Sequence, residues 1–365
     1  MYRSARTTVW SAGLFVLLVA VVLASATLGP VRIDVVTVAM AMLNAAVVPV
    51  DVTITGTSLP ILGISVPAPS LEYATVFSFD VPLTHQIIVE DIRLPRITLA
   101  ATVGLALGAA GTVMQGFFRN PLADPSIIGV SSGAAAGAVA AIVFPGLIPF
   151  GSLHSSAFLG ALATAFLVYA IATDGGRTPV ATLLLAGVAI QTFLGAMISY
   201  MLVHSGDSLR QAVYWMMGHL NNSQWGDVGF ALPITLVGIL ALCAFRRELN
   251  VLLLGEEDAH HLGVEVERTK LLLLVLASIV TAAGVAVAGV IGFVGLVVPH
   301  IMRLIVGPDH RILLPTSALA GASFLVATDT LARIGPAVVP VGIITAALGA
   351  PFFLFLLSRR EVHSL

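Results

Sequence analysis

The chain has 365 residues, of which 58% are hydrophobic and only 10% are charged, and its mean hydropathy is +1.02. Soluble domains carry about 25% charged residues, so this composition excludes an ordinary soluble enzyme as well as an intrinsically disordered chain. A formal net charge of −2 provides no basic field for nucleic acid, and the single Cys243 excludes a disulfide framework or a cysteine metal cluster. We therefore expect a protein whose main solvent is lipid.

Ten apolar segments are candidates for membrane-spanning helices, each of which needs roughly 20 apolar residues to cross a bilayer. Six give the strongest signal: 10–28, 94–114, 152–172, 180–204, 228–245 and 271–291. Four are interrupted by Gly, Pro or a charge: 127–144, 292–305, 313–331 and 341–357. The sequence therefore predicts an all-α, polytopic bundle of about ten transmembrane helices, with 1–365 forming a single transmembrane domain.

The basic residues predict the orientation of the bundle. The first apolar segment follows Arg3 and Arg6 and exceeds the roughly 7–15 residues of a cleaved signal peptide, so we expect a retained first helix. With the N-terminus inside, 12 of the 17 basic residues are cytoplasmic and five lie outside: Arg32, Arg93, Arg96, Arg210 and Arg333. Because Arg and Lys favour the cytoplasmic side, both termini are expected inside.

The segment 31–92 is predicted to be a long external loop. It carries six acidic residues and only Arg32 before the boundary at Arg93. Its first part, 31–48, is apolar enough for an interfacial helix, and the alternation over 50–55 indicates a short strand or extended stretch. Prolines at 60, 67 and 69 disfavour further helix.

The segment 246–270 is the most charged stretch of the chain, with six acidic and four basic residues. In the predicted orientation it is cytoplasmic. We expect a soluble partner to bind there.

Residues for catalysis or metal binding were sought and not found. The only lysine is Lys270, so the chain lacks the phosphate-binding loop of an ATPase. His260 and His261 are adjacent and point about 100° apart on a helix, which makes a poor metal pair. Asp329 and Arg333 are four residues apart and are expected to form a structural ion pair. The sequence therefore predicts a non-catalytic protein that binds no metal or cofactor and takes its energy from another protein.

Several strings then resemble one family, the permeases of ABC importers for iron chelates, haem and vitamin B12. They are IRLPR at 92–96, QGFFRNPLADP at 115–125, GVSSG at 129–133, LLLAGVA at 183–189, GVIGFVGLVVPH at 289–300 and DHR at 309–311. Their order matches the family over about 90–357. The resemblance implies a homodimer of ten-helix subunits in a prokaryotic cell membrane, working with two cytoplasmic ATP-binding subunits, which bind ATP and Mg²⁺, and with an external substrate-binding protein.

Family roles carry over to three sets of positions. The residues that resemble the helices docking on the ATPase are Gly255, Glu256, Glu257, Asp258, Ala259, His260, His261, Leu262 and Gly263. Those that resemble contacts with the binding protein are Arg93, Arg96 and Arg333, for which snorkelling at the membrane interface is the alternative. Those that resemble the cytoplasmic gate are Asn120, Leu122, Val180, Ala181 and Thr182. Val180 and Ala181 replace the small hydroxyl residues frequent in the family, and the loop around 50–79 is longer than the family's.

The substrate is predicted with an alternative left open. The string LRQAVYWMMG at 209–218, ahead of Trp225, resembles vitamin B12 permeases more than siderophore permeases, so a corrinoid is favoured over a ferric siderophore or haem. A secondary transporter would need carboxylates at mid-membrane; the best available residues, Asp207 and Asp329, lie near span ends. An intramembrane enzyme would need a paired nucleophile and base, and the sequence offers none.

Overall fold

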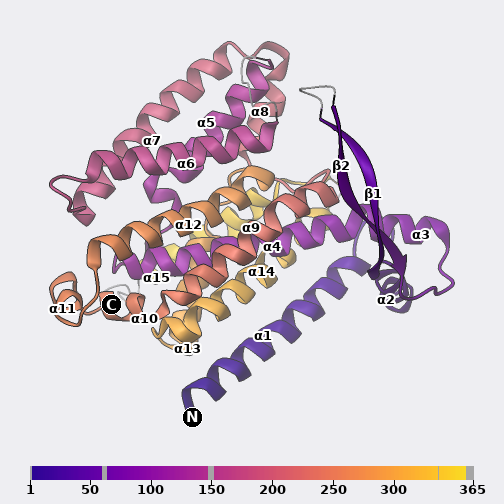
Figure 1. Cartoon of the computed structure of the whole chain (residues 1–365), viewed down its shortest axis with the longest axis horizontal. Helices are drawn as coiled ribbons and strands as arrows, with labels where there is room; N and C mark the ends of the chain where they lie inside the picture. The colour runs from indigo at the N-terminus through magenta and orange to yellow at the C-terminus, as the bar shows by residue number, and fades with distance from the viewer. Residues whose placement is uncertain (1, 60–63, 147–151, 336, 359–365) are drawn as a thin grey trace.

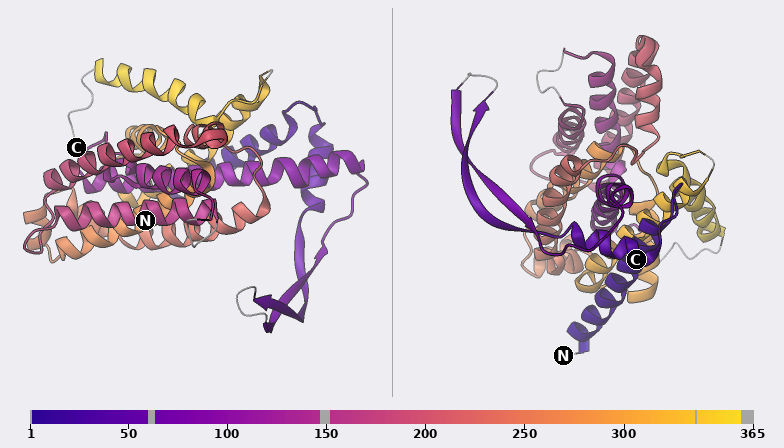
Figure 2. Two further views of the ribbon diagram at one scale, coloured as in Figure 1. Left: turned by 90° about the horizontal axis from the view of Figure 1, so that it is seen from above. Right: turned by 90° about the vertical axis from the view of Figure 1, so that its right-hand side faces the viewer.

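The computed structural model of the chain describes residues 2–59, 64–146, 152–335 and 337–358. The molecule is an elongated bundle of helices with a long hairpin projecting from one end (Figure 1 and Figure 2). The opposite end carries the short helices α10 (Arg246–Leu252) and α11 (Glu256–His261). These two regions are called the hairpin end and the α11 end below.

Each of the ten predicted spans contains a helix within the described residues. Seven of these helices are long and apolar enough to cross a membrane: α1 (Tyr2–Thr27), α4 (Leu94–Phe117), α6 (Leu153–Ala172), α7 (Val180–Val203), α9 (Trp225–Ala244), α12 (Val266–Ala288) and α14 (His310–Ile334). The other three are apolar helices outside that set: α5 (Val130–Val143), α13 (Val294–Val306) and α15 (Val341–Ser358). The predicted helical membrane bundle is confirmed, and a total of ten crossings stays a prediction.

The first and last helices meet the same end of the bundle. Arg6 of α1 donates to the Val306 carbonyl at the end of α13, 3.5 Å away, close to the loop that Asn250 of α10 binds. At the start of α15, the Gly342 amide donates to the Gly218 carbonyl, near the far end of α12. Helix α1 therefore begins at the α11 end, and α15 ends there. This arrangement is the one expected for an even number of membrane crossings.

The short elements lie between the long helices: α2 (Val35–Asn44), α3 (Leu83–Ile87), the π-helix η1 (Ile88–Arg93), the 3₁₀ turns η2 (Pro125–Ile128) and η3 (Gly206–Ser208), and α8 (Leu209–Met216). Helix α2 lies inside the predicted interfacial segment. The last part of the predicted external loop is helical, from Leu83 onward, and its external position stays a prediction. A Gln86–Glu90 hydrogen bond of 3.0 Å and the fully buried Val89 stabilise this extension of α4.

The predicted extended stretch is one strand of an antiparallel hairpin. Strand β1 (Val47–Leu59) pairs with β2 (Ile64–Thr75), and Asp51 lies opposite Glu72. β-branched residues dominate β1, and such residues favour extended backbone. The base of the hairpin is closed by Asn44, whose side chain makes two hydrogen bonds with the Phe79 backbone, at 2.8 and 3.0 Å. Among the described residues, this hairpin is the only sheet beside the predicted all-α bundle.

Helix α4 forms the centre of the bundle. The most apolar window of its segment is 83% buried, and α14, α12, α13 and α9 pack around it. Backbones meet directly where α4 crosses α14, because a Cβ on Gly104 would lie 2.3 Å from the Gly321 oxygen, and the reverse substitution would clash equally. Close approach through small residues is how helices pack in lipid. The glycines therefore place α4 and α14 as one rigid pair.

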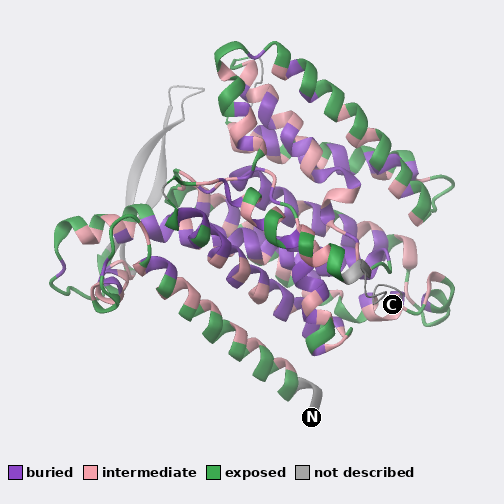
Figure 3. Ribbon diagram, turned by 180° about the vertical axis from the view of Figure 1, so that it is seen from behind, coloured by how far each residue is buried: buried purple, intermediate pink, exposed green. Residues whose placement is uncertain are grey.

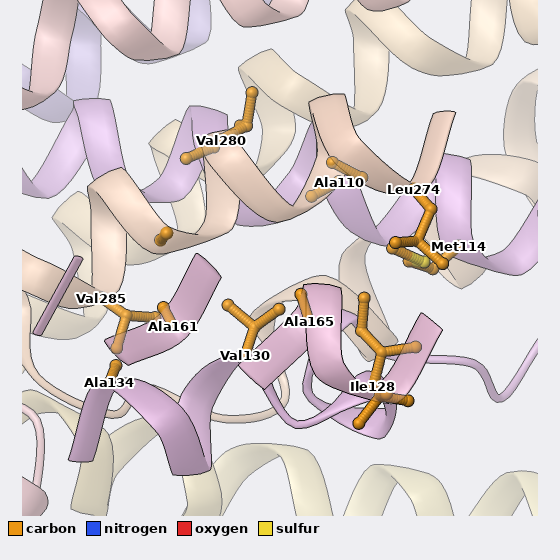
Figure 4. Close-up of a cluster of buried hydrophobic side chains, with 14 of the residues drawn as sticks. Ala110, Met114, Ile128, Val130, Ala134, Ala161, Ala165, Leu274, Val280 and Val285 are labelled. Carbon is orange, nitrogen blue, oxygen red and sulfur yellow. The ribbon is translucent and has the colours of Figure 1, made fainter. Parts of the chain in front are cut away.

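The apolar core joins this pair to α5, α6 and α12. Figure 4 shows part of it, where side chains of α4, α5, α6 and α12 interdigitate around residues such as Met114, Val130, Ala161 and Leu274. By contrast, α1 and α7 are only 11% and 22% buried over their apolar windows and expose most of their surface (Figure 3). Since these exposed faces are apolar, lipid or another protein subunit must cover them.

Candidate functional site

Helix α11 is set apart from the bundle by a glycine on each side. Gly255 and Gly263 have φ angles of 124° and 84°, a region that residues with a side chain rarely adopt. Ala259 is fully buried and anchors the helix against its neighbours, whereas Leu262 is 60% exposed. The predicted coupling residues 255–263 therefore form one short helix with an outward-facing surface.

The ionisable residues of α11 are arranged in the order that the helix dipole favours. Glu256, Glu257 and Asp258 occupy its first turn, and His260 and His261 occupy its last. Negative charge at a helix N-terminus and imidazole at its C-terminus are the favourable arrangement. Beside it lies a cleft of about 690 Å³, lined by Arg177, Glu256, Glu257, His260, Glu265, Val266, Glu267 and Arg268. An exposed, mainly acidic helix beside a cleft is suited to contact a soluble protein.

His260 and His261 are neighbours in the last turn of α11. The rings of His260 and His261 have centroids 6.3 Å apart. Within the residues that the structure describes, no group of three His, Cys, Asp or Glu side chains is placed to hold a metal ion.

The first part of the predicted gate is a tight turn at the end of α4. The side chain of Asn120 accepts a hydrogen bond of 2.9 Å from the Leu122 amide. Arg119, just before it, has a φ of 47°, so the chain reverses sharply there. Leu122 is half-buried, and Asn120 is exposed.

The second part of the predicted gate is the first turn of α7, which contains Val180, Ala181 and Thr182. Across the described chain, no hydrogen bond joins this turn to the Asn120 turn. Helix α7 is instead fixed further along, where Gln191 donates to the Ile127 carbonyl in η2 at 2.8 Å. The first turn of α7 is therefore not held to the Asn120 turn by hydrogen bonds among the described residues. A gating role for both turns stays a prediction.

The three predicted docking arginines gather at the hairpin end, but each has partners inside the chain. Arg93 donates to the carbonyl oxygens of Ala26 and Val31, which close the C-terminal end of α1. Arg96 binds both carboxylate oxygens of Asp329, with its closest contact at 2.8 Å. Two helices and the end of a third are thereby joined.

Arg333 completes the cluster. It lies 3.1 Å from Asp329 and donates to the Ser25 hydroxyl at 2.6 Å, so the predicted Asp329–Arg333 pair is confirmed. Asp329 is 1% exposed and lies between two guanidinium groups, an arrangement that satisfies its buried charge. Little of the Arg93, Arg96 and Arg333 side chains reaches the surface, which limits direct contact with a binding protein. Docking on these three residues stays a prediction.

Two contacts of these sites are not predicted in the sequence analysis. The ion pair between Arg96 and Asp329 joins residues 233 positions apart, and no local pattern signals such a contact. The second contact joins Lys270 to Glu267 at 3.1 Å. Their spacing of three is a usable signal, because residues three apart on a helix are neighbours.

Comparisons with known proteins agree with the fold. Residues 17–359 match the FecCD transport family. The chain is 59% identical over 366 residues to the cobalamin import system permease protein BtuC of Halobacterium salinarum, an alignment that covers 99% of each chain. It is 48% identical over 282 residues to the hemin transport system permease protein HmuU of Yersinia pestis, covering 74% of this chain and 83% of that protein. A solved structure of a metal-chelate type ABC transporter in an inward-facing conformation superposes with a TM-score of 0.78 at 31% identity, covering 96% of this chain and 98% of that one.

Proposed function

Because the chain belongs to the FecCD transport family, we propose that it is the membrane permease subunit of an ATP-driven importer that moves cobalamin or a related corrinoid into a prokaryotic cell. The permease receives its substrate from an external binding protein. ATP is hydrolysed by a separate pair of cytoplasmic subunits, which bind ATP and Mg²⁺.

One observation carries the choice of substrate. The similarity to a cobalamin permease runs through 99% of both chains at 59% identity, so it includes the hairpin segment. The similarity to the hemin permease reaches 48% and leaves out about a quarter of this chain. Haem and iron chelates form the second candidate, supported by that relative and by the metal-chelate transporter structure.

The orientation of the bundle follows from its charges. The α11 end carries the charged segment 246–270 and the start of α1 with Arg6. The positive-inside rule assigns that end to the cytoplasm. The hairpin end then faces outward, where the binding protein delivers substrate.

A second copy of the chain completes the proposed permease. Helix α7 exposes large apolar side chains over about half of its circumference, among them Leu185, Val188, Phe193 and Met197. Such a face at the edge of a bundle is suited to pack against lipid or against the same face of a second subunit. The pathway would then run between the two copies.

Transport in reconstituted vesicles tests this function. The permease, its ATPase and its binding protein are assembled in proteoliposomes, and uptake of cobalamin, hemin and ferric citrate is measured with and without internal ATP. We expect ATP-dependent uptake of cobalamin above that of the two iron compounds. Equal or greater uptake of an iron compound would show that haem or an iron chelate, rather than cobalamin, is the substrate. Uptake driven by an ion gradient without the ATPase would overturn it.

The docking role of α11 has its own test. Reversing both charges, Glu256→Arg with Glu257→Arg, should reduce copurification of the ATPase with the permease, because the acidic first turn of the helix becomes basic. Arg32→Glu, near the hairpin end, is the control and should not affect it. Normal ATPase binding by the double variant would show that α11 is not part of the docking surface.

A further inference from the structure

The only lysine of the chain is buried where three segments meet at the α11 end. The Lys270 side chain is 4% exposed, and it belongs to the first turns of α12. Its Nζ donates to the Thr178 carbonyl at 2.6 Å and to Glu267 at 3.1 Å, and it lies 3.2 Å from a Glu256 oxygen. An ammonium group has three hydrogens to donate, and these three acceptors match that number.

The acceptors belong to functionally different parts of the chain. Glu256 is the first residue of α11, the proposed ATPase contact. Thr178 lies in the turn between α6 and α7, two residues before the first turn of α7 with Val180–Thr182. Glu267, on α12, also accepts a hydrogen bond of 3.1 Å from the Thr178 amide. Lys270 and Glu267 together therefore hold both backbone groups of Thr178.

The remaining link is short and stiff. Pro179 separates Thr178 from α7 and has a φ of −64°, which its ring fixes. The Thr178 hydroxyl also pairs with the Thr173 hydroxyl at 2.9 Å, closing the turn. A displacement of Thr178 is thus passed directly to the first turn of α7.

The chemistry favours lysine at this position. A compact ammonium reaches three acceptors arranged around a point, whereas a guanidinium presents its hydrogens in a flat fork. Every other basic residue of the chain is arginine. Burying an ion pair is costly and stabilises a fold no more than an apolar contact would, so stability alone does not account for this site.

We propose that Lys270 is a positioning residue that transmits movement of α11 to the first turn of α7. When α11 shifts with the ATPase, Glu256 pulls on Lys270, and the Lys270–Glu267 unit moves Thr178 and the start of α7 with it. The inference rests on the proposed function, since it takes α11 as the ATPase contact and Val180–Thr182 as part of the gate.

The test compares transport with ATP hydrolysis in the same proteoliposomes. Lys270→Met removes the charge but keeps a long side chain. We expect cobalamin uptake per ATP hydrolysed to fall at least about fivefold, the lower end of usual coupling between sites. Lys270→Arg should restore part of the ratio, and Glu256→Gln should lower it less than Lys270→Met does, because the amide oxygen that replaces the carboxylate can still accept a hydrogen bond from Lys270. Arg32→Gln is the control, since Arg32 is exposed near the hairpin end, far from this site, and it should keep the wild-type ratio.

A second readout follows the gate itself. In a Cys243→Ala background, Ala181→Cys is labelled by a thiol reagent with and without ATP. ATP should change the labelling rate when Lys270 is present and leave it unchanged in the Lys270→Met variant. A merely structural role would lower the amount of assembled complex and leave both uptake per ATP and the ATP response of position 181 intact, and that result overturns the inference. Absence of ATP-driven uptake by the wild-type complex would instead overturn the proposed function.

Discussion

The two ends of the bundle each hold basic side chains between acceptors from several segments, but they differ in their access to water. At the hairpin end, Arg96, Arg333 and Asp329 are 13%, 7% and 1% exposed. At the α11 end, Lys270 is 4% exposed, yet its carboxylate partners Glu256 and Glu267 are 41% and 33% exposed.

This difference has a mechanical consequence. Separating the hairpin-end ions would leave buried charges without partners, which is among the costliest changes in a protein. The carboxylates of the α11 end are already partly hydrated, so water can replace part of what a movement removes. The hairpin end is therefore a fixed clamp on α1, α4 and α14, whereas the α11 end is a joint whose ion pairs cost less to separate.

The largest expected loss of stability comes from removing the carboxylate of Asp329 at the hairpin end. Asp329→Ala leaves the guanidinium groups of Arg96 and Arg333 without their shared carboxylate, so the free energy of unfolding should fall by about 3–5 kcal/mol. Unfolding in detergent, followed by circular dichroism, measures the loss. Asp329→Asn keeps the shape without the charge and serves as the matched variant. A loss for Asp329→Ala no larger than that of a surface substitution would show that the hairpin end is not a clamp.

A smaller loss is expected where α1 joins the clamp. Ser25→Ala removes the hydroxyl that contacts Arg333 at 2.6 Å and Thr330 at 2.7 Å, and stability should fall by about 1–3 kcal/mol. Thr27→Ala is the control, because the Thr27 hydroxyl binds only within α1, at the Ala24 carbonyl. Equal melting temperatures for the two variants would contradict the interpretation.

The salt dependence of the two ion pairs distinguishes the hairpin end from the α11 end more directly. A double-mutant cycle on Lys270 and Glu256 should give a coupling energy that decreases as NaCl is raised from about 0.1 to 1 M, because a partly exposed pair is screened. The same cycle on Arg96 and Asp329 should change little, since burial excludes the screening ions. A stronger salt effect at the hairpin end would reverse the assignment of clamp and joint.

The smallest effect belongs to the exposed pair beside the joint. The side chains of Arg268 and Glu265 are 74% and 73% exposed at 3.3 Å. Arg268→Gln should change the free energy of unfolding by less than about 1 kcal/mol. Thermal unfolding of the purified permease measures this change, and a larger loss would mean that the α11 end depends on its surface charges for stability.

Sequence reasoning located the helices well and the contacts poorly. Helix α14 contains Pro315 and was placed among the interrupted segments, yet it is one of the longest helices, because packing on α4 supports the whole of it. The sequence does not predict that the end of segment 31–92 is helical, with Val89 buried and the helix beginning at Leu83. The alternation over 50–55 predicts part of strand β1 but not its partner β2, since Pro67 and Pro69 obscure the alternation there.

The sequence by itself determined that lipid is the solvent, where the apolar helices lie, that the phosphate-binding-loop motif is lacking, and that charge is concentrated in 246–270. These properties depend on residue type and local spacing, which a chain carries in any conformation. Only the tertiary structure decided that Arg93, Arg96 and Arg333 are held inside the hairpin end, and that Lys270 joins α11 to the start of α7. The physical reason is that an ion pair depends on distance in space, and the partners of Arg96 and Lys270 are brought near only when the helices pack.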